Sequence, residues 1–184
     1  MEISYRIIRS NRKNLSLEIN EKGLTIRAPK KASDSEIKRF LLQNEKWVLK
    51  NLEKYNKRKE QYKDIQKLTK EELDDLVEKA MDYIPKRVAY YAPIVGVTYN
   101  RITIRNQKTR WGSCSSKGNL NFNCLLMLTP YEVIDSIIVH ELCHRLEMNH
   151  SEKFYSEVLR VYPEYHKWNK WLKENGSKIL YRMN

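Results

Sequence analysis

The sequence predicts an α+β protein, because apolar residues alternate with polar ones in some stretches and recur at helical spacing in others. The alternating stretches lie within residues 3–27 and 97–124. The helical stretches are introduced by capping boxes, in which a Ser or Thr and a Glu three residues later satisfy free amides at a helix start. We therefore expect a small antiparallel sheet, several helices, and an N-terminal β-hairpin followed by a basic helix.

The first stretch predicts strands over 3–8, 14–19 and 24–27. The segment 20–23, which ends in glycine, predicts the turn between the last two strands. Pro29 then stops the third strand. Together these strands predict a small antiparallel sheet at the N-terminus.

A capping box at Ser33–Glu36 predicts a helix whose apolar residues continue at helical spacing to Tyr55. Its other face is lined with lysines and arginines, and the apolar stripe is lost after Lys57. We therefore assign residues 1–68 to an N-terminal part, made of the small sheet and a basic amphipathic helix. Residues 69–184 form the second part.

The second part starts with a capping box at Thr69–Glu72 and a helix that Pro85 is expected to kink or end, and Pro93 and Gly96 to close. Strands follow at 97–105 and 120–124, separated by a polar loop over 109–118.

Thr129–Glu132 is a third capping box and opens a helix with a buried stripe that reaches Leu142. Ser151 or Asn149 can cap the next helix, and Pro163 opens the last one. Gly176 is the expected end of that last helix.

Composition narrows the classes of protein. The formal net charge is +12, and residues 1–70 hold 19 basic and 9 acidic residues against 16 and 14 in the remainder. Such an excess attracts nucleic acid or an acidic partner, although charge runs are commonly only a solvated surface. No apolar run is long enough for a membrane span, and no secretory signal is visible. The three cysteines have no disulfide-like spacing, which indicates a reduced cytoplasmic protein.

The sequence His140-Glu141-Leu142-Cys143-His144 carries the clearest chemical signal. Two histidines four residues apart lie on one helix face and can bind one metal ion. Glu141 lies to the side of them, from where it reaches a water on the metal rather than the metal itself. The motif predicts a metal site with Glu141 as general base.

The third ligand is expected to be His150, which the segment 145–149 can turn back towards the helix. Glu147 and Glu157 are alternatives, since glutamate is the third ligand in other zinc peptidases. Glu147 also stands where the metzincin pattern has glycine, which argues against descent from metzincins. Three protein ligands leave a position open for catalysis.

Two further residues have simpler interpretations. Cys143 faces another side of the helix and is not expected to close the coordination sphere. His166 is expected to be a surface or packing residue, with hydrogen bonding to the reaction's oxyanion as the alternative.

Several separated motifs occur in the order found in one family. They are Arg110–Ser115, Gly118–Asn123, Leu128–Pro130, Ile138–His144 and Asn149–Phe154. With them the chain resembles, over most of its length, the YgjP-like metallopeptidases, which are related to the SprT group. The resemblance implies a zincin-like core, His140, His144 and His150 as zinc ligands, and Glu141 as the catalytic residue. One departure is Cys143, where a small residue such as alanine is expected.

We therefore predict a zinc-dependent hydrolase with one zinc ion that acts on a protein or peptide substrate. Arg110, Trp111 and Asn123 are candidates for lining the cleft or supporting the active-site helix, and 120–124 is a candidate edge strand for an extended substrate. The alternative function is a polyanion-binding protein, with nucleic acid held by the basic N-terminal part and zinc in a structural or regulatory role.

Overall fold

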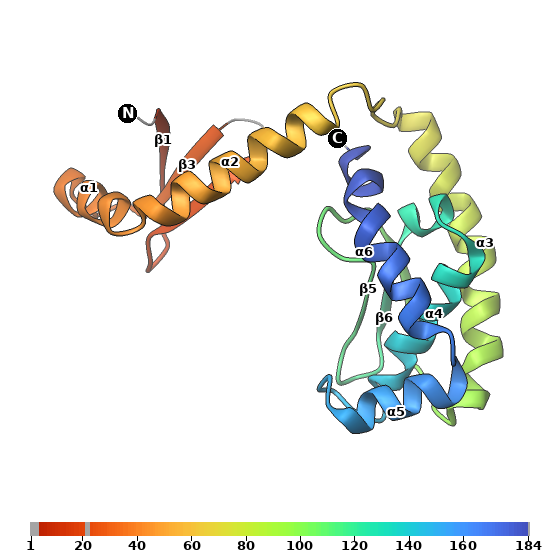
Figure 1. Ribbon diagram of the computed structural model, residues 1–184. Helices are drawn as coiled ribbons and strands as arrows, with labels where there is room; N and C mark the ends of the chain where they lie inside the picture. The colour runs from red at the N-terminus through yellow and green to blue at the C-terminus, as the bar shows by residue number, and fades with distance from the viewer. Residues whose placement is uncertain (1–3, 21–22, 184) are drawn as a thin grey trace. The chain divides into compact units, whose positions relative to one another are not determined.

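The computed structural model describes residues 4–20 and 23–183, and it divides the chain into two compact units, Met1–Asp64 and Ile65–Asn184. Figure 1 shows the helices and strands of both units. The α+β class predicted from the sequence is confirmed, although both sheets are mixed rather than antiparallel. Within the described residues, every helix is too short or too polar to cross a membrane.

The N-terminal sheet contains β1 (Tyr5–Ser10), β2 (Ser16–Asn20) and β3 (Gly23–Pro29) in the order β1-β3-β2. The hairpin of β2 and β3 is antiparallel, as predicted, but β1 pairs with β3 in parallel. The reason is burial: Leu24, Thr25 and Ile26 are consecutive buried residues, so β3 takes the centre and separates β1 from β2. The predicted strand residue Ile3 and turn residues Glu21 and Lys22 lie outside the described residues.

The predicted basic helix is divided in two, α1 (Asp34–Gln43) and α2 (Glu45–Gln61). The break is at Asn44, whose side-chain amide donates to the carbonyl oxygen of Phe40 at 2.8 Å. Asn competes in this way with regular helix hydrogen bonding, which the apolar spacing could not reveal. The capping box of Ser33 and Glu36 is present, and Ile37 of α1 packs on Ile26 and Ala28 of the sheet.

The C-terminal unit starts with α3 (Lys70–Val95), which is capped by Thr69 and Glu72 as predicted. Of the two effects expected of Pro85, an end to the helix is excluded, because α3 continues through Pro85 as one helix. A buried stripe on both sides of Pro85, which includes Ile84 and Val88, packs on the core and compensates for the lost hydrogen bond. The helix ends at Gly96, which has the left-handed conformation.

The second sheet contains β4 (Ile102–Arg105), β5 (Gly112–Cys114) and β6 (Leu120–Asn123) in the order β4-β6-β5. β4 and β6 are parallel, whereas β5 and β6 are antiparallel. Two predictions change here. The strand expected over 97–105 is limited to its last four residues, and the expected loop contains β5. β5 is polar and only three residues long, so it carries no clear alternating pattern.

A short 3-10 helix, η1 (Cys124–Leu128), leads to α4 (Tyr131–Cys143), which packs against α3 and α6 (Figure 1). The capping box predicted at Thr129–Glu132 is not formed. The hydroxyl of Thr129 instead donates to the carbonyl oxygen of Leu126 at 2.7 Å, and the helix begins after Pro130. Pro130 has no N–H, so this start leaves one fewer amide to satisfy.

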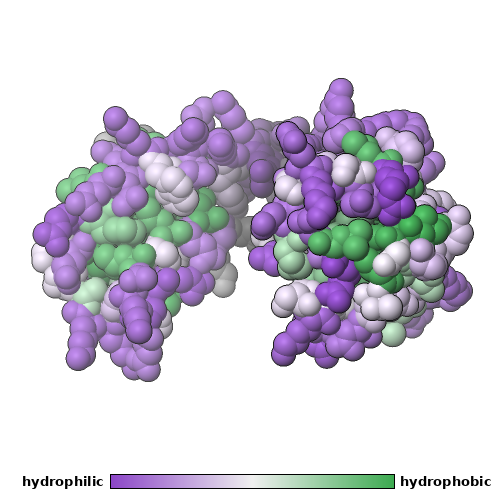
Figure 2. Space-filling model, turned by 90° about the horizontal axis from the view of Figure 1, so that it is seen from below, coloured by the Kyte–Doolittle hydropathy of each residue, from purple (hydrophilic) through white to green (hydrophobic). Residues whose placement is uncertain are grey.

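The last helices are α5 (Glu152–Val161), capped by Ser151, and α6 (Tyr165–Tyr181). The expected end of α6 at Gly176 needs correction, since the helix continues past it. Gly176 is buried, and a Cβ on it would lie 3.0 Å from Cζ2 of Trp111, so this glycine makes room for an indole ring rather than ending the helix. Figure 2 shows hydrophobic areas on each unit bordered by hydrophilic side chains.

Candidate metal centre

Three imidazoles converge at the end of α4. His140 lies in its last turn, His144 is its C-cap, and His150 lies in the loop before α5. The motif is therefore at the C-terminal end of the helix, and the chain leaves the helix directly after the second histidine. This placement lets residues 145–149 return His150 to the first two.

The distances fit a tetrahedral metal ion. The Nε2 atoms of His140 and His150 are 3.1 Å apart, and the candidate ligand atoms of all three histidines lie within 4.8 Å of one another. Two nitrogens bound to one zinc at 2.0–2.1 Å in tetrahedral geometry are about 3.3 Å apart. The imidazoles are therefore arranged so that one ion between them would need little movement of the side chains.

The other ring nitrogens have partners that fix the orientation of two imidazoles. His144 donates from Nδ1 to the carbonyl oxygen of Glu147 at 3.1 Å, which leaves Nε2 unprotonated when the ring is neutral. His140 Nδ1 lies 2.8 Å from the hydroxyl of the buried Tyr165, in α6. Partners of this kind are typical of histidines that bind metal. Sequence reasoning missed Tyr165, because nothing in its local pattern links it to a residue 25 positions away.

Burial keeps two of these histidines neutral. Burial, followed by the nearby His144 and His150, lowers the pKa of His140 to about 3. Burial also lowers the pKa of His144. Phe154 of α5 is fully buried and packs against all three rings. A neutral imidazole has a lone pair to give, so the environment favours metal binding over protonation.

Glu141 is buried, with 5% of its surface exposed. Burial raises the pKa of its carboxyl group to about 8. A cation held by the three histidines would act in the opposite direction and favour the carboxylate. The side chain lies directly against the backbone of Gly112 in β5, where no other residue type leaves room for it.

The two alternative third ligands lie in ion pairs elsewhere. Glu147 is 2.8 Å from Lys153, and Glu157 is 2.9 Å from Arg160. The one set of three ligand groups that converges, among the residues that the structure describes, consists of the histidines.

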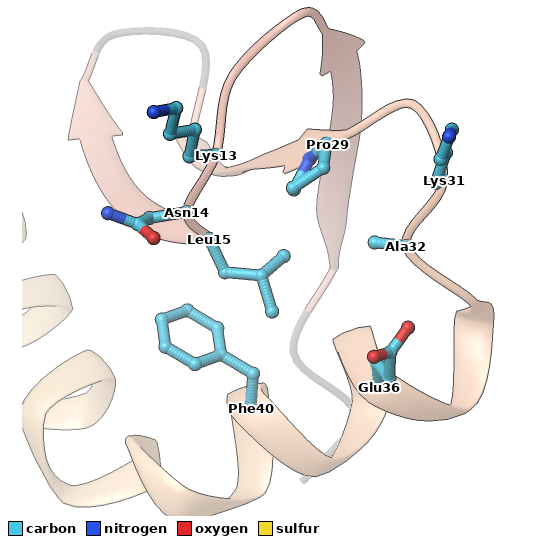
Figure 3. Close-up of a pocket in the computed structure, with 8 residues that line it drawn as sticks. All are labelled: Lys13, Asn14, Leu15, Pro29, Lys31, Ala32, Glu36 and Phe40. Atoms are coloured by element: carbon cyan, nitrogen blue, oxygen red, sulfur yellow. The ribbon is translucent and has the colours of Figure 1, made fainter.

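The histidines border a pocket of about 260 Å³. Its lining residues come from β5 and the loop before it, and from the end of α4 and the loop after it: Arg110, Gly112, Ser113, Cys114, His140, Glu141, His144, Met148 and His150. A larger pocket of about 540 Å³ lies in the N-terminal unit, between α1 and the ends of the strands (Figure 3). Among the described residues that line this second pocket there is no imidazole or thiol, and their one carboxylate, Glu36, is used in a helix cap.

The three cleft or support candidates have different positions. Arg110 lines the metal pocket, whereas Trp111 packs against Gly176 of α6. Asn123 is buried and donates to the carbonyl oxygens of Gln107 and Arg110, at 2.7 and 2.8 Å. Its own side-chain oxygen accepts from the amide of Leu125 at 3.1 Å. Asn123 therefore fixes the loop before β5.

The remaining polar candidates are away from the imidazoles. Cys143 is fully buried in the core, and its thiol has a pKa raised to about 12 by burial. His166 is exposed at the start of α6, with its ring 6.2 Å from that of Tyr155. Neither residue lines the metal pocket.

Convergent histidines next to a buried glutamate in an α+β unit are typical of metallopeptidases. The chain belongs to the YgjP-like family: the family model described as "YgjP-like, metallopeptidase domain" matches residues 13–74 and 62–175. The predicted family resemblance is thereby confirmed.

Two solved structures are similar, the metallopeptidase zymogens Pyrococcus abyssi abylysin and Methanocaldococcus jannaschii jannalysin. Each is 22% identical with a TM-score of 0.45 and covers 50% of this chain, and the matches cover 93% and 95% of the two zymogens. No curated protein matches the chain.

Proposed function

We propose that the protein is a zinc-dependent peptidase with one metal ion held by His140, His144 and His150. The observation that carries this proposal is the pocket that contains all three ligand side chains and Glu141 together. Imidazole ligands suit zinc, and three of them leave a coordination position for chemistry. Zinc, when bound there, supplies a Lewis acid that polarises a carbonyl group and makes water more acidic.

Glu141 acts as the general base. Its carboxylate takes a proton from the water that attacks the scissile carbonyl carbon, and it then delivers that proton to the leaving amine. The carboxylate is held between α4 and β5, so it does not have to be ordered when the substrate binds.

β5 is the strand along which we expect the substrate to lie. The sequence pointed to residues 120–124 for this role, but β6 is the central strand and β5 is at the edge. Gly112, Ser113 and Cys114 of β5 line the metal pocket. An edge strand can pair with an extended peptide through backbone hydrogen bonds, and here that would bring a peptide bond next to the histidines.

The test uses Glu141→Gln, which keeps the size of the side chain but removes its basicity. We expect this variant to bind one zinc per chain and to lose at least about 1,000-fold in cleavage of an unfolded protein such as casein. His140→Ala is the matched variant that should lose both zinc and activity. Cleavage by Glu141→Gln at the parent's rate would remove Glu141 from the mechanism.

We propose polyanion binding by the N-terminal unit as the second candidate function. Residues 1–64 contain 17 basic and nine acidic residues. Five acidic side chains are used in ion pairs or caps: Glu18, Asp34, Glu36, Glu53 and Glu60. Lys46, Lys50 and Lys54 are exposed on α2 and make no ion pair within the described residues, beside the exposed Trp47.

A salt titration of the binding of a single-stranded oligonucleotide tests this second function. Affinity should fall steeply with salt, because each phosphate contact releases a counterion. A Lys46→Gln, Lys50→Gln, Lys54→Gln variant should show a shallower slope. If salt has no effect on affinity, or no binding occurs at low salt, the basic face is only a solvated surface.

A further inference from the structure

We propose that Arg110 determines substrate specificity by binding a carboxylate of the peptide next to the bond to be cleaved. The inference rests on the proposed peptidase function and names a substrate class for it: peptides with an acidic side chain, or a free C-terminal carboxylate, near the cleaved bond. The two sources share one chemistry, a carboxylate that an arginine can hold with two hydrogen bonds.

The first observation is the position of Arg110. It lines the metal pocket together with the three histidines, Glu141 and Met148. Arg110 is exposed, and its guanidinium has no hydrogen bond or ion pair in the part of the chain that the structure describes. It is also the pocket's one lysine or arginine among those residues. An arginine beside the reacting centre, with no acidic partner of its own, is available to a ligand.

The second observation is the charge around this arginine. Glu141 is the single carboxylate among the lining residues that the structure describes, and it forms no ion pair with Arg110 there. The nearby loop carboxylate, Glu147, is paired with Lys153 at 2.8 Å. Neither carboxylate therefore pairs with Arg110, and zinc would add further positive charge to the pocket. The unpaired Arg110 and the charge of zinc both favour binding of an anionic group of the substrate in this pocket.

The third observation is that the backbone of Arg110 is anchored. Its carbonyl oxygen accepts from the buried amide of Asn123, and the next carbonyl, of Trp111, accepts from the backbone amide of Asn123 at 2.8 Å. The Trp111 ring is held against Gly176. A ligand therefore has to order only the side chain of Arg110 and not its backbone, which limits the entropy that is lost on binding.

The position also limits where the carboxylate lies in the substrate. Arg110 is two residues before Gly112, and Gly112 is in contact with Glu141. Two extended residues span at most about 7 Å. A peptide lying along β5 would therefore bring to Arg110 a side chain or terminus one or two residues from the bond that Glu141 serves.

The test measures binding separately from cleavage. The zinc-loaded Glu141→Gln chain is titrated into fluorescein-labelled octapeptides made of Ala, Gly and Leu. One peptide carries a single Asp, and its neutral match has Asn in that place. Another has a free C-terminus, and its neutral match has an amidated one. We expect at least one carboxylate peptide to bind about tenfold more tightly than its neutral match. Arg110→Gln, made in the same background, should abolish that preference and leave the neutral peptide's affinity unchanged.

Two further variants complete the design. Lys108→Gln removes a nearby exposed charge that does not line the pocket, and it should keep the preference. Arg110→Lys should keep only part of it, because an ammonium lacks the planar pair of donors. The peptide with Asp and the peptide with a free C-terminus show whether Arg110 binds a side-chain carboxylate or a terminal carboxylate.

The inference is overturned if Arg110→Gln keeps the preference, if it weakens all peptides equally, or if neutral peptides bind as tightly as acidic ones. Failure of the proposed peptidase function gives a different result, since the zinc-loaded parent would then cleave none of these peptides or casein even where the carboxylate preference is present.

Discussion

Glu141 and Gly112 are in such close contact that a Cβ on Gly112 would lie 2.6 Å from Oε1 of Glu141 and 2.8 Å from its Cγ. Real Cβ atoms do not approach other atoms so closely, so a side chain at residue 112 and the present position of Glu141 exclude each other. The glycine therefore places the catalytic candidate next to the edge strand. Within the predicted polar loop, residue 112 therefore has to lack a side chain so that Glu141 fits.

Gly112→Ala should displace the Glu141 carboxylate and lower kcat by about 100-fold, the usual cost of a shift near 1 Å at a reacting group. Zinc content should stay at the parent's value, because residue 112 is not one of the three metal-binding side chains. The measurement is peptide cleavage beside metal analysis. In a Glu141→Gln background the same substitution should cause little further loss, and an additive loss would show that Gly112 acts independently of Glu141.

Tyr165→Phe should weaken zinc binding by about 10–100-fold, since the hydroxyl lost is the hydrogen-bond partner of His140 Nδ1. Competition with a zinc chelator measures the affinity directly. Tyr155→Phe is the matched control: Tyr155 also lies near the site, 6.2 Å from the His150 ring between centroids, but makes no hydrogen bond to a histidine. Equal effects of the two variants would contradict a specific role for the Tyr165 hydroxyl.

These two contacts mark the limit of what the sequence can predict about the site. His140 and His144 are one helical turn apart and Glu141 directly follows His140, so the proximity of the three follows from local geometry. Gly112 and Tyr165 reach the site from β5 and α6, and single-sequence patterns carry no information about such tertiary contacts.

The fold shows the same division between local and distant information. Capping boxes at Ser33 and Thr69 were predicted, because they depend on residues three apart. The parallel pairing of β1 with β3 and the uninterrupted helix at Pro85 depend on packing between distant residues. The division of the chain after residue 68 stays a prediction, and the compact units separate after Asp64.

Asp135→Asn should lower the free energy of unfolding by about 2–4 kcal/mol, because Asp135 joins α4 to α3. Its carboxylate accepts from Arg87 at 2.8 and 2.6 Å and from Tyr91 at 3.2 Å, and it is largely buried. Denaturant unfolding measures the change. The exposed ion pair of Lys79 and Asp75 is the control, and Asp75→Asn should cost less than about 1 kcal/mol.

Stability should also fall as the pH rises from 10 to 12, and Tyr91 should cause part of that loss. Burial, followed by the nearby Asp135 carboxylate, raises the pKa of Tyr91 to about 12. The unfolded chain releases this proton near pH 10, so the folded state holds more protons between the two values and loses stability there. Tyr91→Phe should make the decline shallower over the same range. An unchanged slope would mean that Tyr91 titrates normally in the folded protein.

Zinc should stabilise the folded chain, and His150 allows this effect to be separated from packing. The ligand atoms lie within 4.8 Å of one another in the folded chain, so zinc should bind the folded state in preference to the unfolded one. At 100 times the dissociation constant that preference contributes about 2.7 kcal/mol, which appears as a rise in Tm that a chelator reverses. His150 is exposed, so His150→Ala should leave the Tm of the metal-free chain almost unchanged and remove most of the zinc-dependent rise. Glu147→Gln tests the alternative third ligand and should keep the full rise. If instead Glu147→Gln loses it and His150→Ala does not, the third ligand is the glutamate.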